Sequence, residues 1–224
     1  MTFPDLPPEE RDAPVQFDAH ELAMPTVLTG ASATAVGEWL CAVAKTHDAQ
    51  IAALDYVLVT DEYLHAMNVE RLAHDTLTDV ITFDLSEGGA GPVEGECYIS
   101  LPRVLENASA YGASVRGKGR FSMLPALEGG ASWIMVGRAD RTEAQDRVSP
   151  VYEVHSPPPA EAAPPAAGLS PPEQLELLRV IAHGLLHLCG LGDKTSAEAE
   201  KMRAAEDAAL YIWRSRFARP AQLG

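Results

Sequence analysis

The sequence lacks the features of a membrane or secreted protein. No apolar run approaches the roughly 18 residues that indicate a membrane-spanning helix. Residues 1–21 are acidic and contain proline, whereas a secretory signal begins with basic residues followed by an apolar stretch. Only three cysteines occur, and the absence of a C-x-x-C pair argues against a disulfide framework and against a thiolate zinc site. We therefore expect a cytoplasmic protein with reduced thiols and no membrane association.

Basic residues are also scarce. The 224 residues include 17 Lys and Arg against 32 Asp and Glu, which gives a formal charge of -15. Nucleic-acid binding normally draws on a basic surface, so any site for RNA has to be a local patch. Residues 112–118 have most of a phosphate-binding loop, but Gly119 stands where a Ser or Thr would bind Mg²⁺. We therefore expect no nucleotide cofactor.

The sequence does contain the apolar periodicity of a folded domain, since 46% of the residues are hydrophobic. Helical spacing and β-branched runs alternate along the chain. The order predicts an α+β fold with a small mixed β-sheet packed with helices, the histidine-bearing helix being central. The predicted helices are 32–47, one capped by Asp61, one from Ser100 that fades near Gly112, 173–189, and one with a Thr195 and Glu198 capping box; the predicted strands are 51–60 and 80–83, with 97–100 as a hairpin partner.

Composition divides the chain into three parts. Residues 1–21 read as a flexible acidic lead-in, and residues 22–118 together with 173–219 as a single catalytic domain. Residues 119–172 are predicted to be an insertion that ends in a proline-rich linker. Within this insertion, the apolar run 133–136 is a candidate strand or hairpin.

A pair of histidines carries the chemistry. His183 and His187 are four residues apart, so both rings project from one face of the predicted helix and can share a metal ion. Gly190 and Gly192 allow the chain to reverse just after the helix, so that Asp193 can bring a carboxylate to the same ion. The helix is apolar nearly all round, with a stripe of leucine and isoleucine opposite the histidines at Leu178, Ile181, Leu185 and Leu188. Such a helix is expected to be buried, and buried imidazole rings need polar partners, which a metal ion would supply.

Two imidazoles and one carboxylate suit zinc and leave a fourth position for water, as in catalytic zinc sites. We therefore predict one zinc ion per chain, bound by His183, His187 and Asp193. Two other interpretations stay open at this stage. The histidines could be hydrogen-bonded core residues, and Asp193 could be the cap of the following helix, for which Thr195 is the other candidate.

Three sequence blocks resemble the YbeY-type endoribonucleases of bacteria. Residues 183–190 are similar to the H-G-x-L-H-L-x-G signature, residues 74–83 to the T-[DN]-V-[LI]-[ST]-F strand, and residues 95–100 to the G-D-I-x-I-S strand. Most members have a histidine as the third zinc ligand. This chain has Asp193 at that position and so resembles a branch of the family in which the third ligand is an aspartate. The resemblance covers roughly residues 49–111 and 173–210.

The resemblance implies a zinc-dependent, single-strand-specific endoribonuclease that acts in ribosomal RNA processing. It implies a ribosomal RNA precursor as substrate and the ribosome or its proteins as partners. Typical members have an arginine, thought to hold RNA phosphate, where this chain has Leu72. The candidate RNA-binding residues are instead Arg71, His74, Arg116 and Lys118.

Two alternative functions follow from the same residues. The spacing of the two histidines, Gly190 and Asp193 also matches a metzincin-like zinc peptidase, which needs a glutamate as general base where this chain has Gly184. The other alternative is a non-catalytic module stabilised by zinc, which a fourth protein ligand would favour.

Overall fold

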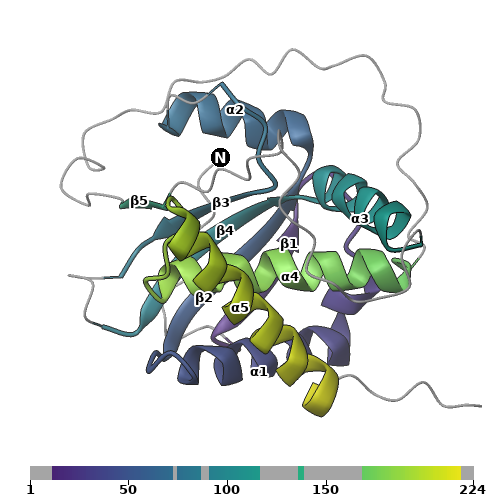
Figure 1. Ribbon diagram of the computed structural model, residues 1–224. Helices are drawn as coiled ribbons and strands as arrows, with labels where there is room; N and C mark the ends of the chain where they lie inside the picture. The colour runs from purple at the N-terminus through teal and green to yellow at the C-terminus, as the bar shows by residue number, and fades with distance from the viewer. Residues whose placement is uncertain (1–11, 73–74, 87–90, 117–135, 139–167, 218–224) are drawn as a thin grey trace, which may run out of the picture.

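The computed structural model describes residues 12–72, 75–86, 91–116, 136–138 and 168–217 (Figure 1). The described helices are α1 (Gly30–Lys45), α2 (Asp61–Leu72), α3 (Leu101–Arg116), α4 (Pro171–Leu188) and α5 (Ser196–Ile212), with a 3-10 turn at Thr26–Leu28 and a π-helical turn at Trp213–Phe217. The strands are β1 (Val15–Ala19), β2 (Ile51–Val59), β3 (Val80–Asp84), β4 (Val93–Ser100) and β5 (Val136–Arg138).

The strands form one mixed sheet in the order β1-β2-β4-β3-β5. Strands β1, β2 and β4 are parallel, β3 is antiparallel to β4, and β5 is parallel to β3. Residue Val80 is opposite Ile99, and Phe83 is opposite Glu96. This confirms the predicted hairpin between β3 and β4 and the predicted α+β class.

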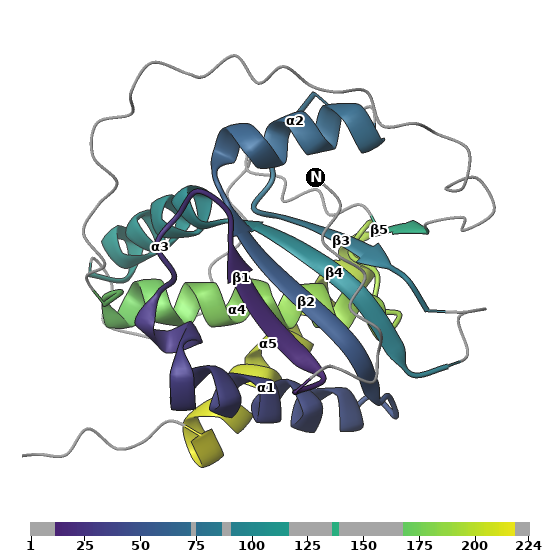
Figure 2. The same cartoon turned by 180° about the vertical axis from the view of Figure 1, so that it is seen from behind.

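The two faces of the sheet have different covers (Figures 1 and 2). Side chains of a strand alternate between its faces, so Tyr56 and Leu58 of β2 enter the large core formed with α1, α4 and α5. On the opposite face, Val57 and Val59 pack in a smaller cluster with Leu64 of α2. Helix α4 contacts α1, α3, α5, β3 and β4. The histidine-bearing helix is therefore central, as predicted.

Helix α4 begins earlier than the predicted residue 173. The backbone N–H of Ser170 donates a 2.7 Å hydrogen bond to the Glu173 carboxylate, and Pro171 occupies the first turn, where its missing N–H costs nothing. Helix α4 therefore includes Pro171 and Pro172, the last two residues of the predicted linker. The signal was present in the sequence, because Ser170 and Glu173 have the spacing of a capping box.

Two further expectations need correction. The lead-in was predicted to extend to residue 21, but Val15–Ala19 form the edge strand β1 and pair with β2. Asp61 was predicted to cap α2, but the Thr60 hydroxyl accepts the hydrogen bond from the Tyr63 N–H at 3.2 Å. The Asp61 carboxylate instead accepts hydrogen bonds from Ser100 and Arg103, and so connects α2 to the start of α3.

Several predictions concern residues beyond those that the structure describes. These are the first 11 residues of the lead-in, most of the insertion, and residues 133–135 of the candidate strand. Residue Val136 begins β5. Helix α3 continues to Arg116, past the predicted fading point at Gly112. No helix in the described part of the chain is long and apolar enough to cross a membrane.

Candidate metal centre

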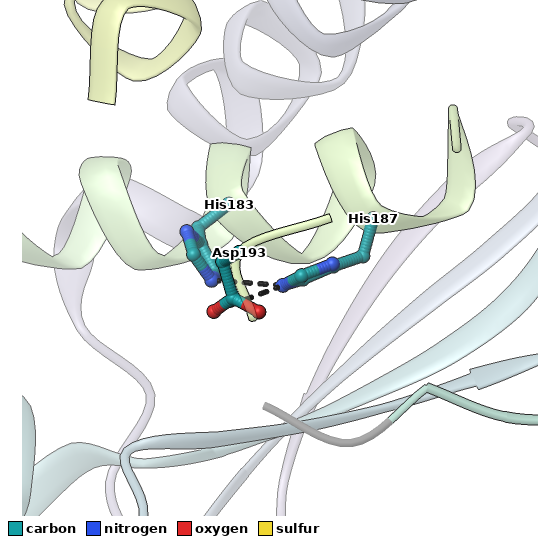
Figure 3. A group of neighbouring side chains, drawn as sticks. All are labelled: His183, His187 and Asp193. Carbon is teal, nitrogen blue, oxygen red and sulfur yellow. Dashed lines mark hydrogen bonds and ion pairs between the residues drawn. The ribbon is translucent and has the colours of Figure 1, made fainter. Parts of the chain in front are cut away.

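Three side chains from α4 and the loop after it converge on one point (Figure 3). His183 and His187 lie one helical turn apart, and Asp193 reaches them from the loop between α4 and α5. Their nearest ligand atoms all lie within 4.8 Å of one another. The side chain of His187 is 2% exposed, and those of His183 and Asp193 are 13% and 15% exposed. The three predicted metal ligands therefore form a largely buried group.

The chain reversal after α4 explains how Asp193 arrives there. Gly190 has φ of +89°, a left-handed conformation that favours glycine, and its N–H donates to the His187 carbonyl at 2.8 Å. The Leu191 N–H donates to the Leu186 carbonyl at 3.0 Å, which closes the turn. The predicted chain reversal at Gly190 is thus confirmed.

Asp193 does not cap the next helix. The Thr195 hydroxyl accepts a 3.2 Å hydrogen bond from the Glu198 N–H, and the Glu198 carboxylate accepts one from the Thr195 N–H at 2.9 Å. This capping box begins α5 as predicted. The alternative role for Asp193 is therefore filled by Thr195, and the Asp193 carboxylate faces the histidines instead.

Hydrogen bonds orient both imidazole rings. Nδ1 of His183 contacts the Glu206 carboxylate at 2.5 Å, and Nδ1 of His187 contacts the Leu191 carbonyl at 2.8 Å. Carboxylate and carbonyl oxygens only accept hydrogen bonds, so in each ring Nδ1 carries a hydrogen and donates it. The two Nε2 atoms lie 3.0 Å apart. When both rings are neutral, as metal binding requires, no proton lies between the two Nε2 atoms, and a cation placed there would remove the repulsion between their lone pairs.

The spacing of the ligand atoms fits zinc. A tetrahedral zinc ion with bonds of roughly 2.0–2.1 Å places its ligand atoms about 3.3 Å apart. The distance between the Nε2 atoms is 3.0 Å, and that between His187 Nε2 and Asp193 Oδ2 is 3.9 Å. The separations within the group extend up to 4.8 Å, so the side chains would have to draw together to bind one zinc ion. Within the described ranges the group has three members, so a fourth position stays available for water or substrate.

Burial sets the protonation of the group. Desolvation, assisted by the neighbouring His183, lowers the pKa of His187 to about 4. The ring of His187 is consequently neutral near pH 7, which a nitrogen ligand requires. Desolvation raises the pKa of Asp193, because a charged carboxylate is poorly solvated in this partly buried position. A bound cation would favour the charged form of Asp193.

Sequence reasoning missed Glu206. This α5 residue is 7% exposed and accepts hydrogen bonds from both His183 and Arg179. Burial alone would raise the pKa of Glu206, but the hydrogen bond and charge of His183 and the charge of Arg179 outweigh it and lower the pKa. A signal existed in the sequence, because Glu206 is an acidic residue on the otherwise apolar stripe of Met202, Ala209 and Leu210.

The predicted RNA-binding residues are not all brought to this group. Exposed Arg71 is in the last turn of α2, which packs on the opposite face of the sheet from α4. Arg116 is the last residue of α3. His74 and Lys118 lie outside the described residues. The structure thus unites the predicted metal ligands and separates Arg71 from them.

His183, His187 and Asp193 form a candidate metal site of the kind that metal-dependent hydrolases use. A family model described as Endoribonuclease YbeY matches residues 26–124. An Endoribonuclease YbeY from Cytophaga hutchinsonii is 34% identical over 174 residues, which cover 78% of this chain and 80% of that protein. The chain therefore belongs to the YbeY endoribonuclease family.

A second relative matches a similar share of the chain. An Endoribonuclease YbeY from Flavobacterium johnsoniae is 30% identical over 176 residues, covering 79% of this chain and 84% of that protein. A solution structure of a Thermotoga maritima protein matches 94% of this chain and 98% of its own chain, with 19% identity and a TM-score of 0.42. The family-model match ends at residue 124, before α4, so the metal group rests on its own geometry.

Proposed function

We propose that the protein is a zinc-dependent, single-strand-specific endoribonuclease that acts in ribosomal RNA processing. One zinc ion per chain is held by His183, His187 and Asp193. The observation that carries the proposal is the pair of Nε2 atoms 3.0 Å apart, each on a ring whose Nδ1 is engaged elsewhere. Family membership supports RNA as the substrate. A ribosomal RNA precursor is the proposed substrate and the ribosome the proposed partner.

The charges of the three ligand side chains determine which substrate the site favours. When bound, zinc would polarise a phosphodiester group and lower the pKa of water. His183 and His187 contribute neutral nitrogen ligands, so Asp193 supplies the one formal negative charge among the three. The site therefore keeps a net positive charge with a divalent cation, which favours an anionic phosphodiester over a neutral peptide bond.

The packing of Gly184 argues against a peptidase. The corresponding glutamate of a zinc peptidase acts as general base beside the metal. Here a Cβ atom on residue 184 would lie 2.9 Å from the Cys97 sulfur, so a side chain at this position points against β4. A glutamate would have no room without displacing the helix. Phosphodiester cleavage depends more on charge stabilisation and less on such a base.

The decisive experiment compares the cleavage of three substrates by the same zinc-loaded protein. Zinc-loaded protein is incubated separately with short unstructured RNA, the same RNA annealed to its complement, and an unstructured peptide. We expect cleavage of the single-stranded RNA alone, lost after chelation and restored by zinc. Zinc-dependent peptide cleavage without RNA cleavage would overturn the assignment, and so would zinc binding without cleavage of either substrate.

RNA affinity tests the proposed basic residues. Arg71, His74, Arg116 and Lys118 are proposed to contact the RNA backbone, because the overall charge of -15 requires a local patch. Replacing Arg116 and Lys118 together by glutamine should weaken RNA binding and reduce its dependence on salt, while zinc content stays the same. The variant Arg71→Gln tests whether α2, on the opposite face of the sheet from α4, also contributes to RNA affinity. Equal RNA affinity in all these variants would remove them from the RNA site.

A further inference from the structure

A chain of partly buried polar contacts connects α5 to the candidate metal ligand His183. One oxygen of Glu206, Oε1, lies 2.5 Å from His183 Nδ1, and the other, Oε2, lies 3.2 Å from Arg179 Nη1. The same Arg179 nitrogen contacts Asp207 at 3.2 Å. Arg179 and His183 lie one turn apart on α4, so Glu206 occupies the space beside both of them.

Glu206 is buried, and this distinguishes it from the neighbouring carboxylate of Asp207. Its side chain is 9% exposed, whereas that of the neighbouring Asp207 is 66% exposed. A buried carboxylate requires charged or hydrogen-bonding partners, and Glu206 has one for each oxygen. Arg179 holds one oxygen, so the other is kept at a fixed position toward the histidine. Asp207 shares Arg179 but does not reach the histidine, because its contact is at the exposed rim.

We propose that Glu206 is a positioning residue of the metal centre, which fixes the tautomer and ring orientation of His183, and that Arg179 holds Glu206 in place. By accepting the Nδ1 hydrogen of His183, the carboxylate directs the Nε2 lone pair toward His187 and Asp193 and makes that nitrogen a stronger donor. This inference rests on the proposed zinc site and adds a residue from α5 to it. The metal affinity then depends on the docking of α5 against α4.

Zinc affinity is the direct test. Competition with a chromophoric chelator measures the dissociation constant of zinc without any RNA. Losing a hydrogen-bond partner of a metal-bound histidine typically weakens metal binding roughly 10- to 100-fold, which we expect for Glu206→Leu. Glu206→Gln keeps an oxygen that accepts the Nδ1 hydrogen bond but loses the charge, so its zinc affinity should lie between those of wild type and the leucine variant.

The matched control is Asp207→Asn. Besides Glu206, the carboxylates of Asp207 and Glu176 also contact Arg179, and this substitution removes the one of Asp207, which does not touch His183. Its zinc affinity should equal that of wild type. A second readout is the ring N–H proton of His183 in the zinc-loaded protein, whose downfield NMR signal should be present in wild type and Asp207→Asn and absent in Glu206→Leu.

A merely structural ion pair gives a different pattern. Denaturant unfolding of the metal-free variants would then show lost stability in Glu206→Leu, while zinc affinity and the His183 signal stay at the wild-type values, and this result would overturn the proposal. If Glu206→Leu does not fold, Glu206→Gln decides alone, and an affinity equal to that of Asp207→Asn is the negative outcome.

The outcomes also separate this inference from the proposed function. A wild-type protein that binds zinc but cuts no RNA would overturn only the ribonuclease activity. A wild-type protein that cuts RNA, with zinc affinity unaffected by both Glu206 variants, would overturn only the positioning role.

Discussion

Gly184 of α4 lies directly against the Cys97 thiol of β4. A Cβ atom on Gly184 would be 2.9 Å from the Cys97 sulfur and 3.4 Å from the Thr82 hydroxyl. Both side chains are fully buried, so neither can swing into solvent. The absent side chain lets the histidine-bearing helix approach the sheet closely, and the glycine between the two histidines has a packing role there.

Gly184→Ala should therefore destabilise the protein by about 1–3 kcal/mol, the usual cost of overpacking a core. Urea unfolding of the metal-free protein measures it. Adding Cys97→Ala removes the sulfur that the new methyl group meets and should restore part of the loss. A double variant no more stable than Gly184→Ala would show that the close contact with Cys97 is not the cause.

The metal ligands give a second prediction. His183→Ala and His187→Ala should purify without zinc, because a three-ligand site loses most of its affinity with one ligand. Asp193→Ala should weaken zinc binding, whereas Asp193→His should retain it, since imidazole is also a zinc ligand. Metal analysis by mass spectrometry provides the measurement. The control is His65→Ala, because His65 pairs with Asp75 outside the group. Zinc retained at one equivalent in both histidine variants would show that the site is elsewhere.

The thiols should differ in reactivity. Burial raises the pKa of Cys97 to about 12 and that of Cys189 to about 11. Burial also raises the pKa of Cys41, although Lys45 opposes this. At pH 8 the thiolate fraction of Cys97 is therefore on the order of one in ten thousand, and thiolate is the reactive form. Alkylation followed by peptide mapping should modify Cys41 first and leave Cys97 unmodified until denaturant is added. Early modification of Cys97 in the native protein would contradict its placement in the core.

The cap of α4 gives a pH-dependent prediction. Hydrogen bonds from the side chain and backbone of Ser170 lower the pKa of Glu173. A carboxyl group whose pKa is lower in the folded state stabilises the fold above its unfolded pKa of about 4.5, and this contribution disappears as pH falls through the folded value. Glu173→Gln should thus be less stable than wild type at pH 7 and equal to it in stronger acid.

Urea unfolding at pH 7 and pH 3 measures this difference. Glu200→Gln is the control, because Glu200 is exposed in α5, and its replacement should leave stability unchanged at both pH values. A difference for Glu173→Gln that stays constant with pH would show that the carboxylate charge is not responsible.

Much of the fold and the candidate metal group follows from local sequence patterns. The spacing of His183 and His187 places both rings on one helical face because the helix period is local. The β-branched residues of β3 and the spacing of Thr195 and Glu198 likewise depend on neighbours within a few residues. Gly190 signals the chain reversal in the same way. The central helix, the hairpin and the association of both histidines with Asp193 were therefore predictable.

Tertiary structure decided the contacts between distant segments. The acidic, proline-bearing composition around β1 concealed a strand, and only pairing with β2 makes Val15–Ala19 part of the sheet. Thr60 caps α2, because Ser100 and Arg103 occupy the Asp61 carboxylate from another element. Glu206 meets His183 only because α5 folds back along α4. Helix and turn formation depends on residues near in sequence, whereas a buried carboxylate finds its partners only through packing of the whole domain.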